Sequence, residues 1–213
     1  MILNPHNLPE KNHSTTALIL HANGRDILMR MDDRVPLWGL AGGGNLEANK
    51  DPTLEQSYID TVHQEVLEEA NTRVEIIEFV GETWGWMRRG GYNHERIYLA
   101  RLAPGAPAPT LGDEGAAIGW FPYDALPKNT TPRVRKRIEA CFDPNRKEPF
   151  SIVYDDTVLG RHRFADEIYH WAKEDITGID TWLASERVKQ KMAKGECFGL
   201  FNRYPPQKVP ALS

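Results

Sequence analysis

The chain has 213 residues, a formal net charge of −4, and 40% hydrophobic and 26% charged residues. This length is sufficient for one substantial hydrophobic core with an appendage, and the composition is typical of a globular protein. The small negative charge excludes a global basic field that would attract nucleic acid or an anionic membrane. We therefore expect no strong nucleic-acid binding and no membrane partner.

The apolar runs and the cysteines predict the compartment. The longest apolar run near the N-terminus covers residues 17–20, which is too short for a signal sequence or a membrane span. Cys141 and Cys197 are too few for a disulfide framework, which favours a reducing, cytoplasmic location. Buried small side chains are the expected role of both thiols.

The N-terminal part begins with a predicted hairpin and continues into a run of glycines. Apolar residues 15–20 and 27–31 flank Asn23-Gly24, a dipeptide typical of tight hairpin turns. Three glycines follow at residues 42–44. Such a run permits unusual backbone angles and the close approach of a ligand, although a flexible loop is its more common role.

A long helix is predicted to begin at Thr53, because Thr53 and Gln56 have the spacing of a capping box. Apolar residues then recur at helical spacing, and Asn71 is an acceptable left-handed cap at the end. The stripe expected to be buried consists of Ile59, Val62, Val66 and Ala70.

The same helix would carry three carboxylates on a neighbouring stripe. Glu65, Glu68 and Glu69 stand at offsets 0, 3 and 4, so they gather on one side of a helix. Their like charges repel, and a hard divalent cation such as magnesium, which prefers oxygen ligands, would relieve that repulsion. The cluster is a candidate metal site, and a solvated acidic surface is the alternative.

The remaining pattern alternates short elements with loops. Strands are predicted at residues 74–80, 83–87, 96–102 and 118–121, followed by a basic amphipathic helix over residues 133–142. Beyond Pro149 the sequence predicts one more strand within residues 151–158 and helices over residues 161–174 and 179–194.

This order of elements, with the glycines and the glutamate-rich helix, resembles the Nudix hydrolase family. The family motif is G-x5-E-x7-R-E-U-x-E-E-x-G-U, in which U is a bulky apolar residue. Its first glycine, second glutamate, first U and closing glutamate pair correspond here to Gly43, Glu65, Val66, Glu68 and Glu69. The resemblance covers residues 14–142 and extends to Trp38-Gly39-Leu40 and to the stretch from Asp113 to Pro127.

The sequence also departs from that motif. Gln64 replaces the arginine, Asn71 replaces the second glycine, Gln56 stands where the first glutamate is expected, and Thr72 occupies the last apolar position. From Gly43 to Gln64 there are 21 positions rather than 14, so the intervening loop has seven extra residues. Because the family's arginine and first glutamate support the metal ligands by charge pairing, their joint loss leaves Glu65 without a cationic neighbour.

The resemblance implies metal-dependent hydrolysis of a diphosphate linkage in a nucleoside diphosphate derivative. The implied ligands of magnesium, for which manganese can substitute, are Glu65, Glu68, Glu69 and the carbonyl of Gly43. Close carboxylates should also have raised pKa values, which suits Glu68 or Glu69 to accept a proton. A loop acid is the alternative base, and Glu114 is the first candidate and Asp113 the second, unless both are simply solvated.

Arg88 and Arg89, between the predicted strands, and Trp86, near the end of the first of them, are candidate substrate-binding residues. Guanidinium groups bind phosphate through two donors, and an indole face can stack on a nucleobase. The alternative is an exposed arginine turn beside a core tryptophan. The expected partner is thus a small, nucleotide-like molecule.

For the fold, the resemblance implies an α/β/α sandwich with a mixed β-sheet over residues 1–145. Residues 146–213 would form a helical extension that packs on the core or on a partner subunit, so a homodimer is among the expectations. The alternative function is a Nudix-fold ligand sensor or transcriptional regulator with a C-terminal interaction segment and little catalysis. Residues 149–213 hold nine Lys/Arg and nine Asp/Glu, which gives no electrostatic footprint for DNA.

Overall fold

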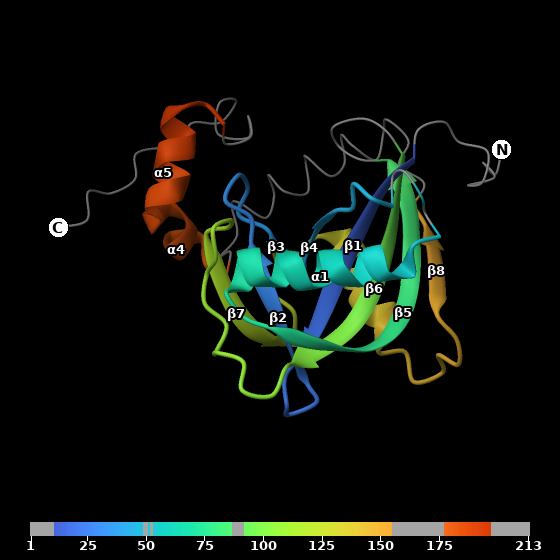
Figure 1. The fold of residues 1–213 in the computed structure, drawn as a ribbon. Helices are drawn as coiled ribbons and strands as arrows, with labels where there is room; N and C mark the ends of the chain where they lie inside the picture. Colours follow the sequence, from blue (N-terminus) through green and yellow to red (C-terminus); the bar gives the residue numbers. More distant parts are fainter. Residues whose placement is uncertain (1–10, 49–50, 52, 87–91, 155–176, 197–213) are drawn as a thin grey trace.

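The computed structural model describes residues 11–48, 51, 53–86, 92–154 and 177–196. Within these residues a mixed, eight-stranded sheet lies between helix α1 (Glu55–Ala70) on one face and three further helices on the other. Figure 1 shows α1 lying across the strands, with the C-terminal helices at the end of the sheet that carries β7. The arrangement confirms the expected α/β/α sandwich.

The sheet is built around two long parallel strands, β1 (Lys11–Leu20) and β6 (Tyr92–Leu102). On one side β1 pairs antiparallel with β2 (Asp26–Met31), and on the other side β6 pairs antiparallel with β5 (Val74–Trp86). The remaining strands are β3 (Trp38–Gly39) and β7 (Ala117–Pro122) beside β2, β4 (Ala41–Gly44) beside β1, and β8 (Phe150–Val153) beside β5.

Alternation along the strands divides the core into two layers. Ala17 and Ile19 of β1 pack with Val62 and Val66 of α1, whereas Leu18 points to the opposite face. That second layer is covered by α2 (Pro132–Cys141), α4 (Ile179–Ala184) and α5 (Glu186–Ala193). Cys141 lies in this layer and is buried as expected, while Cys197 is outside the described residues.

The predicted capping box of α1 is wrong. The helix begins at Glu55, and its N-cap, Leu54, makes no side-chain cap hydrogen bond. The hydroxyl of Thr53 instead donates to Asp51 Oδ1 over 2.7 Å, so it is not available to the helix amides. The other end is as predicted: Asn71 takes a left-handed conformation with φ 48°, and its N–H donates to the Leu67 carbonyl over 3.0 Å.

Other predicted boundaries also shift. Residues 42–44 belong to strand β4 rather than to a loop, because their backbone pairs with β1. The strands predicted at 74–80 and 83–87 are one continuous strand with two irregularities in its pairing to β6. The helix predicted over 179–194 is two helices, since Ser185 has an extended conformation between them.

The C-terminal part of the described chain packs on the core. Strand β8 lies after residue 145, where the helical extension was expected to begin. It nevertheless belongs to the sheet, because it pairs with β5. Trp182 of α4 is completely buried, and its indole N–H donates to the Asp32 carbonyl over 2.7 Å. The helix predicted over residues 161–174 lies outside the described residues.

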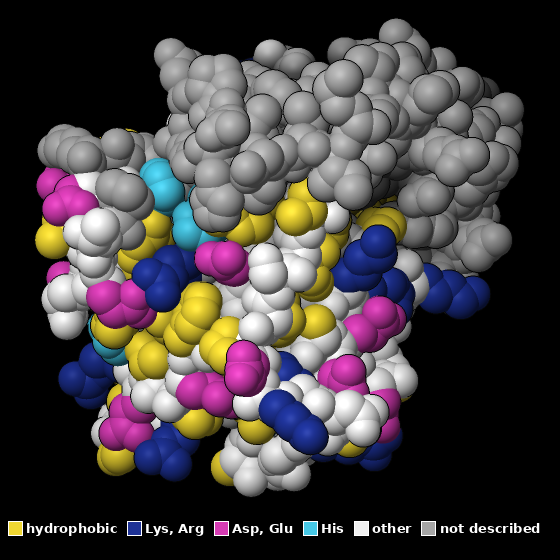
Figure 2. Space-filling view, turned by 90° about the vertical axis from the view of Figure 1, so that its right-hand side faces the viewer, with side chains coloured by type: hydrophobic (Ala, Val, Ile, Leu, Met, Phe, Trp, Pro, Cys, Tyr) yellow, Lys and Arg dark blue, Asp and Glu magenta, His cyan; other side chains and the backbone are white. Residues whose placement is uncertain are grey.

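The surface has the mixed character expected from the composition. On the described part of the face in Figure 2, acidic and basic side chains are interspersed, with hydrophobic side chains between them. None of the helices in the described part of the chain is both long enough and apolar enough to cross a membrane.

Candidate active site

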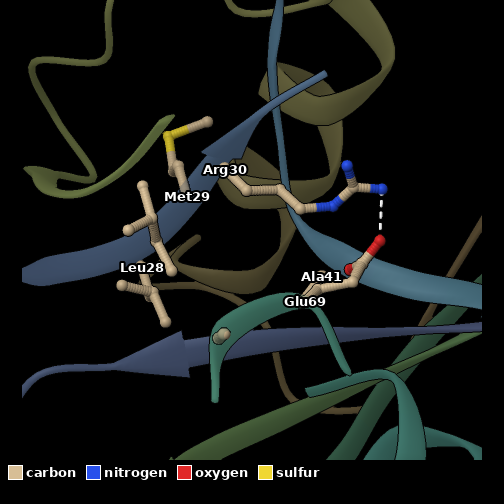
Figure 3. A pocket seen from close by; sticks show the side chains of 7 residues that line it. Leu28, Met29, Arg30, Ala41 and Glu69 are labelled. Carbon is tan, nitrogen blue, oxygen red and sulfur yellow. Dashed lines mark ion pairs between the residues drawn. The ribbon is translucent and has the colours of Figure 1, made fainter. Parts of the chain in front are cut away.

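Glu69 is the buried member of the carboxylate cluster on α1. Its side chain is 2% exposed, forms an ion pair with Arg30 of β2, and accepts a hydrogen bond from the Gly42 N–H over 2.9 Å. Figure 3 shows the Arg30 side chain extending from β2 toward Glu69. Burial raises the pKa of Glu69 to about 7 against the opposing effects of Arg30 and the Gly42 N–H, and the charges of Glu65 and Glu114 raise it further. The Glu69 carboxyl is therefore expected to titrate near neutral pH.

Glu65 lies one helical turn before Glu69 and is partly buried. Burial raises the pKa of Glu65, and the charges of Glu68 and Glu114 act in the same direction while Arg30 opposes them. Strand β4 passes directly beside this side chain, because a Cβ atom on Gly43 would lie 1.9 Å from Glu65 Oε1. Glycine at this position is what lets the backbone approach the carboxylate.

Glu68 is exposed on the same helix. Its Oε1 accepts a hydrogen bond from Gln64 Nε2 over 2.8 Å. Gln64, which stands where the motif has arginine, thus contacts the carboxylate cluster as a neutral donor rather than as a cation.

A loop after β6 docks on the C-terminal end of α1. The N–H groups of Thr110, Gly112 and Asp113 donate to the carbonyls of Ala70, Glu69 and Glu68 over 3.0, 3.0 and 2.8 Å. These carbonyls belong to the last turn of the helix, where no intrahelical donor remains. A Cβ atom on Gly112 would lie 1.9 Å from the Glu68 carbonyl oxygen, so glycine is required for this approach.

The docked loop brings Glu114 to the carboxylate cluster. Its charge raises the pKa values of both Glu65 and Glu69, so it acts on the two carboxyls across the gap between the loop and α1. Asp113 and Glu114 are both exposed. The structure therefore places together all four of the predicted site glutamates, and their catalytic and metal-binding roles stay predictions.

Arg30 is the site residue that the sequence reasoning missed. Leu28 packs against α1 while Met29 and Met31 pack in the opposite layer, so Arg30 faces α1. The sequence signal for Arg30 was a charged residue on the side of a buried strand that faces a helix, which indicates an ion-pair partner on that helix. Arg30 also corrects one expectation, because its charge lowers the pKa values of Glu65 and Glu69 and so supplies the cation that Gln64 does not.

The predicted substrate residues are only partly described. Arg88 and Arg89 lie outside the described residues, and of Trp86 only the backbone, at the end of β5, is described. Among the residues that the structure describes, no group of three or more His, Cys, Asp or Glu side chains is close enough to hold a metal ion. Metal ligation by Gly43, Glu65, Glu68 and Glu69 stays a prediction.

The fold agrees with the comparison to known families. The model of the NUDIX domain matches residues 11–141 of the chain. The chain belongs to the Nudix family. No curated protein matches its sequence.

Solved Nudix structures have the same fold. A MutT Nudix hydrolase from Burkholderia pseudomallei is 23% identical with a TM-score of 0.50, over 61% of this chain and 97% of that one. A Nudix hydrolase from Nitrosomonas europaea is 15% identical with a TM-score of 0.53, over 70% and 81% of the two chains. A MutT protein from Methanosarcina mazei Go1 is 16% identical with a TM-score of 0.52, over 66% and 100%. At these identities the likeness shows the fold.

The departures of this chain from the Nudix motif have local explanations at two positions. Asn71 adopts the left-handed conformation for which glycine is commonest, and its side-chain amide donates to the Leu111 carbonyl over 2.9 Å. Glycine could not make that contact. Thr72 is buried where the motif has an apolar residue, and its hydroxyl donates to the Pro107 carbonyl over 2.7 Å. Both side chains therefore form hydrogen bonds to the loop that precedes Glu114.

Proposed function

We propose that this Nudix protein hydrolyses a diphosphate linkage in a nucleoside diphosphate derivative by attack of water on phosphorus. The observation that carries the proposal is the convergence of Glu65 and Glu69 from α1 with Glu114 from the docked loop. Their charges act on one another, so the site concentrates negative charge at a surface-accessible end of a helix. A structural ion-pair network would balance its charges, whereas this cluster has a single described arginine, Arg30, against its glutamates.

By its chemistry the donor set suits a hard divalent cation, Mg²⁺ or Mn²⁺, and the described glutamates would have to move closer together to hold one. The set consists of carboxylate oxygens from Glu65, Glu68, Glu69 and Glu114, and Gly43, whose backbone passes beside Glu65, is the further proposed ligand through its carbonyl. Burial raises the pKa of Glu65, repulsion from Glu68 and Glu114 raises it further, and a bound cation would relieve that repulsion. When bound, such a cation neutralises phosphate oxygens and lowers the pKa of a coordinated water.

The surroundings of the glutamates suggest a division of labour. Glu69 is fixed by Arg30 and by the Gly42 N–H, so its position is predefined before substrate arrives. Glu68 and Glu114 are exposed, so either can reach a water molecule bound with the substrate. We assign proton acceptance to Glu114 first, because its loop docks on the end of α1 and its charge acts on Glu65 and Glu69, with Glu68 and Glu69 as the alternatives. Arg88, Arg89 and Trp86 remain the proposed contacts to phosphate and nucleobase.

The proposal is tested by assaying phosphate release from a panel of nucleoside diphosphate derivatives with magnesium, with manganese and with chelator. We expect metal-dependent turnover in the wild type. The Glu69→Gln variant should lose about a hundred- to ten-thousandfold in kcat, because it removes a group able to hold charge or a proton at the reacting centre.

The matched control is Glu78→Gln, which makes the same chemical change at an exposed residue paired with Arg146 on the surface. It should keep wild-type turnover. Equal activity in Glu69→Gln and Glu78→Gln would contradict the assignment of the site. Ligand binding without turnover on any substrate would instead favour a Nudix-fold sensor.

A further inference from the structure

The loop that carries Glu114 is anchored on both sides of that residue. Before it, the N–H groups of Gly112 and Asp113 donate to the carbonyls of Glu69 and Glu68 in the last turn of α1. After it, the Ala116 N–H donates to the Met31 carbonyl of β2 over 2.9 Å. Glu114 therefore lies in a short span between a helix end and a strand.

A side chain from the C-terminal extension crosses this span. Arg187 of α5 points its Nη1 at the Gly112 carbonyl, 3.4 Å away, and at the Gly115 carbonyl, 3.5 Å away. One of these carbonyls precedes the Asp113-Glu114 pair and the other follows it. A charged donor shared between them limits how far the two ends of the span can separate.

Helix α5 is itself fixed to the core, so Arg187 has a defined position. Val188, the next residue, is completely buried, and Lys191 forms an ion pair with Asp33 over 2.7 Å. Gly178 at the start of α4 has φ 81°, and a Cβ atom there would lie 3.0 Å from the Met31 side chain. The extension is thus seated on the same part of β2 that holds the loop.

The loop also lies close to Arg30, the cationic side chain beside the site glutamates. Gly115 has φ 99°, which glycine adopts readily, and a Cβ atom there would lie 3.9 Å from Arg30 Nη1. A displacement of the loop would therefore change the distance of Glu114 from Arg30 and from the α1 carboxylates together.

From this geometry we propose that Arg187 is a positioning residue, which holds Glu114 in place for the reaction and makes α5 part of the catalytic unit. The inference rests on the proposed function, because it assigns Arg187 a role in that same hydrolysis. Residues 177–196 would then contribute to activity although the Nudix domain match ends at residue 141.

The test compares Arg187→Ala and Arg187→Lys in the full-length chain. We expect Arg187→Ala to lower kcat about ten- to a hundredfold with little change in KM, since small misplacements of a reacting group have effects of that size. Arg187→Lys keeps a cationic donor and should restore part of kcat. In hydrogen exchange, the amides of Gly112, Asp113 and Ala116 should exchange about tenfold faster in Arg187→Ala.

Two variants on α5 serve as controls. Lys189→Ala removes an exposed side chain whose ion-pair partner is Glu186 on the same helix. Lys191→Ala removes the contact with Asp33 and so weakens the seating of α5 without touching the loop. Lys189→Ala should keep wild-type kcat and wild-type exchange in residues 112–116. Lys191→Ala keeps Arg187 itself, so it should change both quantities less than Arg187→Ala does, even if it lowers Tm.

Wild-type loop exchange in Arg187→Ala would overturn the proposal, and so would faster exchange with unchanged kcat. A fall in kcat that Lys191→Ala reproduces equally would also overturn it, since general loosening of α5 would then be the cause. If the wild type hydrolyses nothing, the proposed function fails separately, and the exchange data alone decide whether Arg187 holds the loop.

Discussion

Glu69 and Glu95 are both buried and both paired with an arginine, on opposite faces of the sheet. Glu95 of β6 is paired with Arg137 of α2 and accepts hydrogen bonds from the hydroxyls of Thr16 and Thr83. A second arginine, Arg133, is close by: burial and the charge of Arg137 lower its pKa, and the charge of Glu95 opposes them. Glu95 is therefore surrounded by positive charge and by donors.

Glu69 has fewer partners for its charge. Burial raises its pKa to about 7 although Arg30 and the Gly42 N–H oppose this, and the charges of Glu65 and Glu114 add to the rise. A buried carboxyl with few partners and with other carboxylates nearby binds its proton more tightly than an exposed one. The comparison separates a structural ion pair from the site that we propose to bind a cation and to accept a proton.

The largest expected effect is on stability at the structural pair. Glu95→Gln removes the charge that neutralises Arg137, whose side chain is 11% exposed, and should lower the free energy of unfolding by about 3 kcal/mol. Urea denaturation of the variant measures this loss. Glu78→Gln, at an exposed ion pair, should change it by less than about 1 kcal/mol. Equal effects of the two substitutions would show that Glu95 is not a structural residue.

A second effect on stability, with about 3 kcal/mol as its upper limit, concerns pH and Glu69. Its pKa is about 7 in the folded state against 4.5 for the ordinary carboxyl, so between these values the folded state binds the proton more tightly. The stability it contributes is present below about pH 4.5 and is lost as the pH rises through 7, a decrease of about 3 kcal/mol at most. Denaturation in the presence of chelator should show this decrease in the wild type.

The Glu69→Gln variant serves as the reference for that measurement, because it has no carboxyl to titrate at this position. Its unfolding free energy should depend less steeply on pH between 4.5 and 7. Identical pH dependence in the wild type and the variant would mean that Glu69 has an ordinary pKa.

The sequence predicted the local parts of the site. The spacing of Glu65, Glu68 and Glu69 placed them on one helix. The glycine run was interpreted as allowing the close approach of a ligand, and in the structure Gly43 allows the backbone to pass close to Glu65. Asn71 was predicted as a left-handed cap because Asn tolerates that conformation. These features depend on residues that are close together in the chain.

Contacts between distant segments were not predictable in the same way. The Arg30–Glu69 pair depends on which face of β2 meets α1, and that follows from strand register rather than from local spacing. The capping box failed because Asp51 competes for the Thr53 hydroxyl. The contact of Arg187 with the Glu114 loop joins the extension to the Nudix domain, and no motif describes it.

Calorimetric titration of Mn²⁺ into the full-length protein tests the central claim most directly. We propose that the glutamates of α1 and Glu114 bind a divalent cation, so the wild type should bind Mn²⁺ saturably. The Glu68→Gln/Glu69→Gln double variant should lose this binding while keeping its fold. A Glu75→Gln/Glu78→Gln double variant, altered at two surface ion pairs, should retain it. Wild-type binding in the Glu68→Gln/Glu69→Gln protein would contradict the assignment.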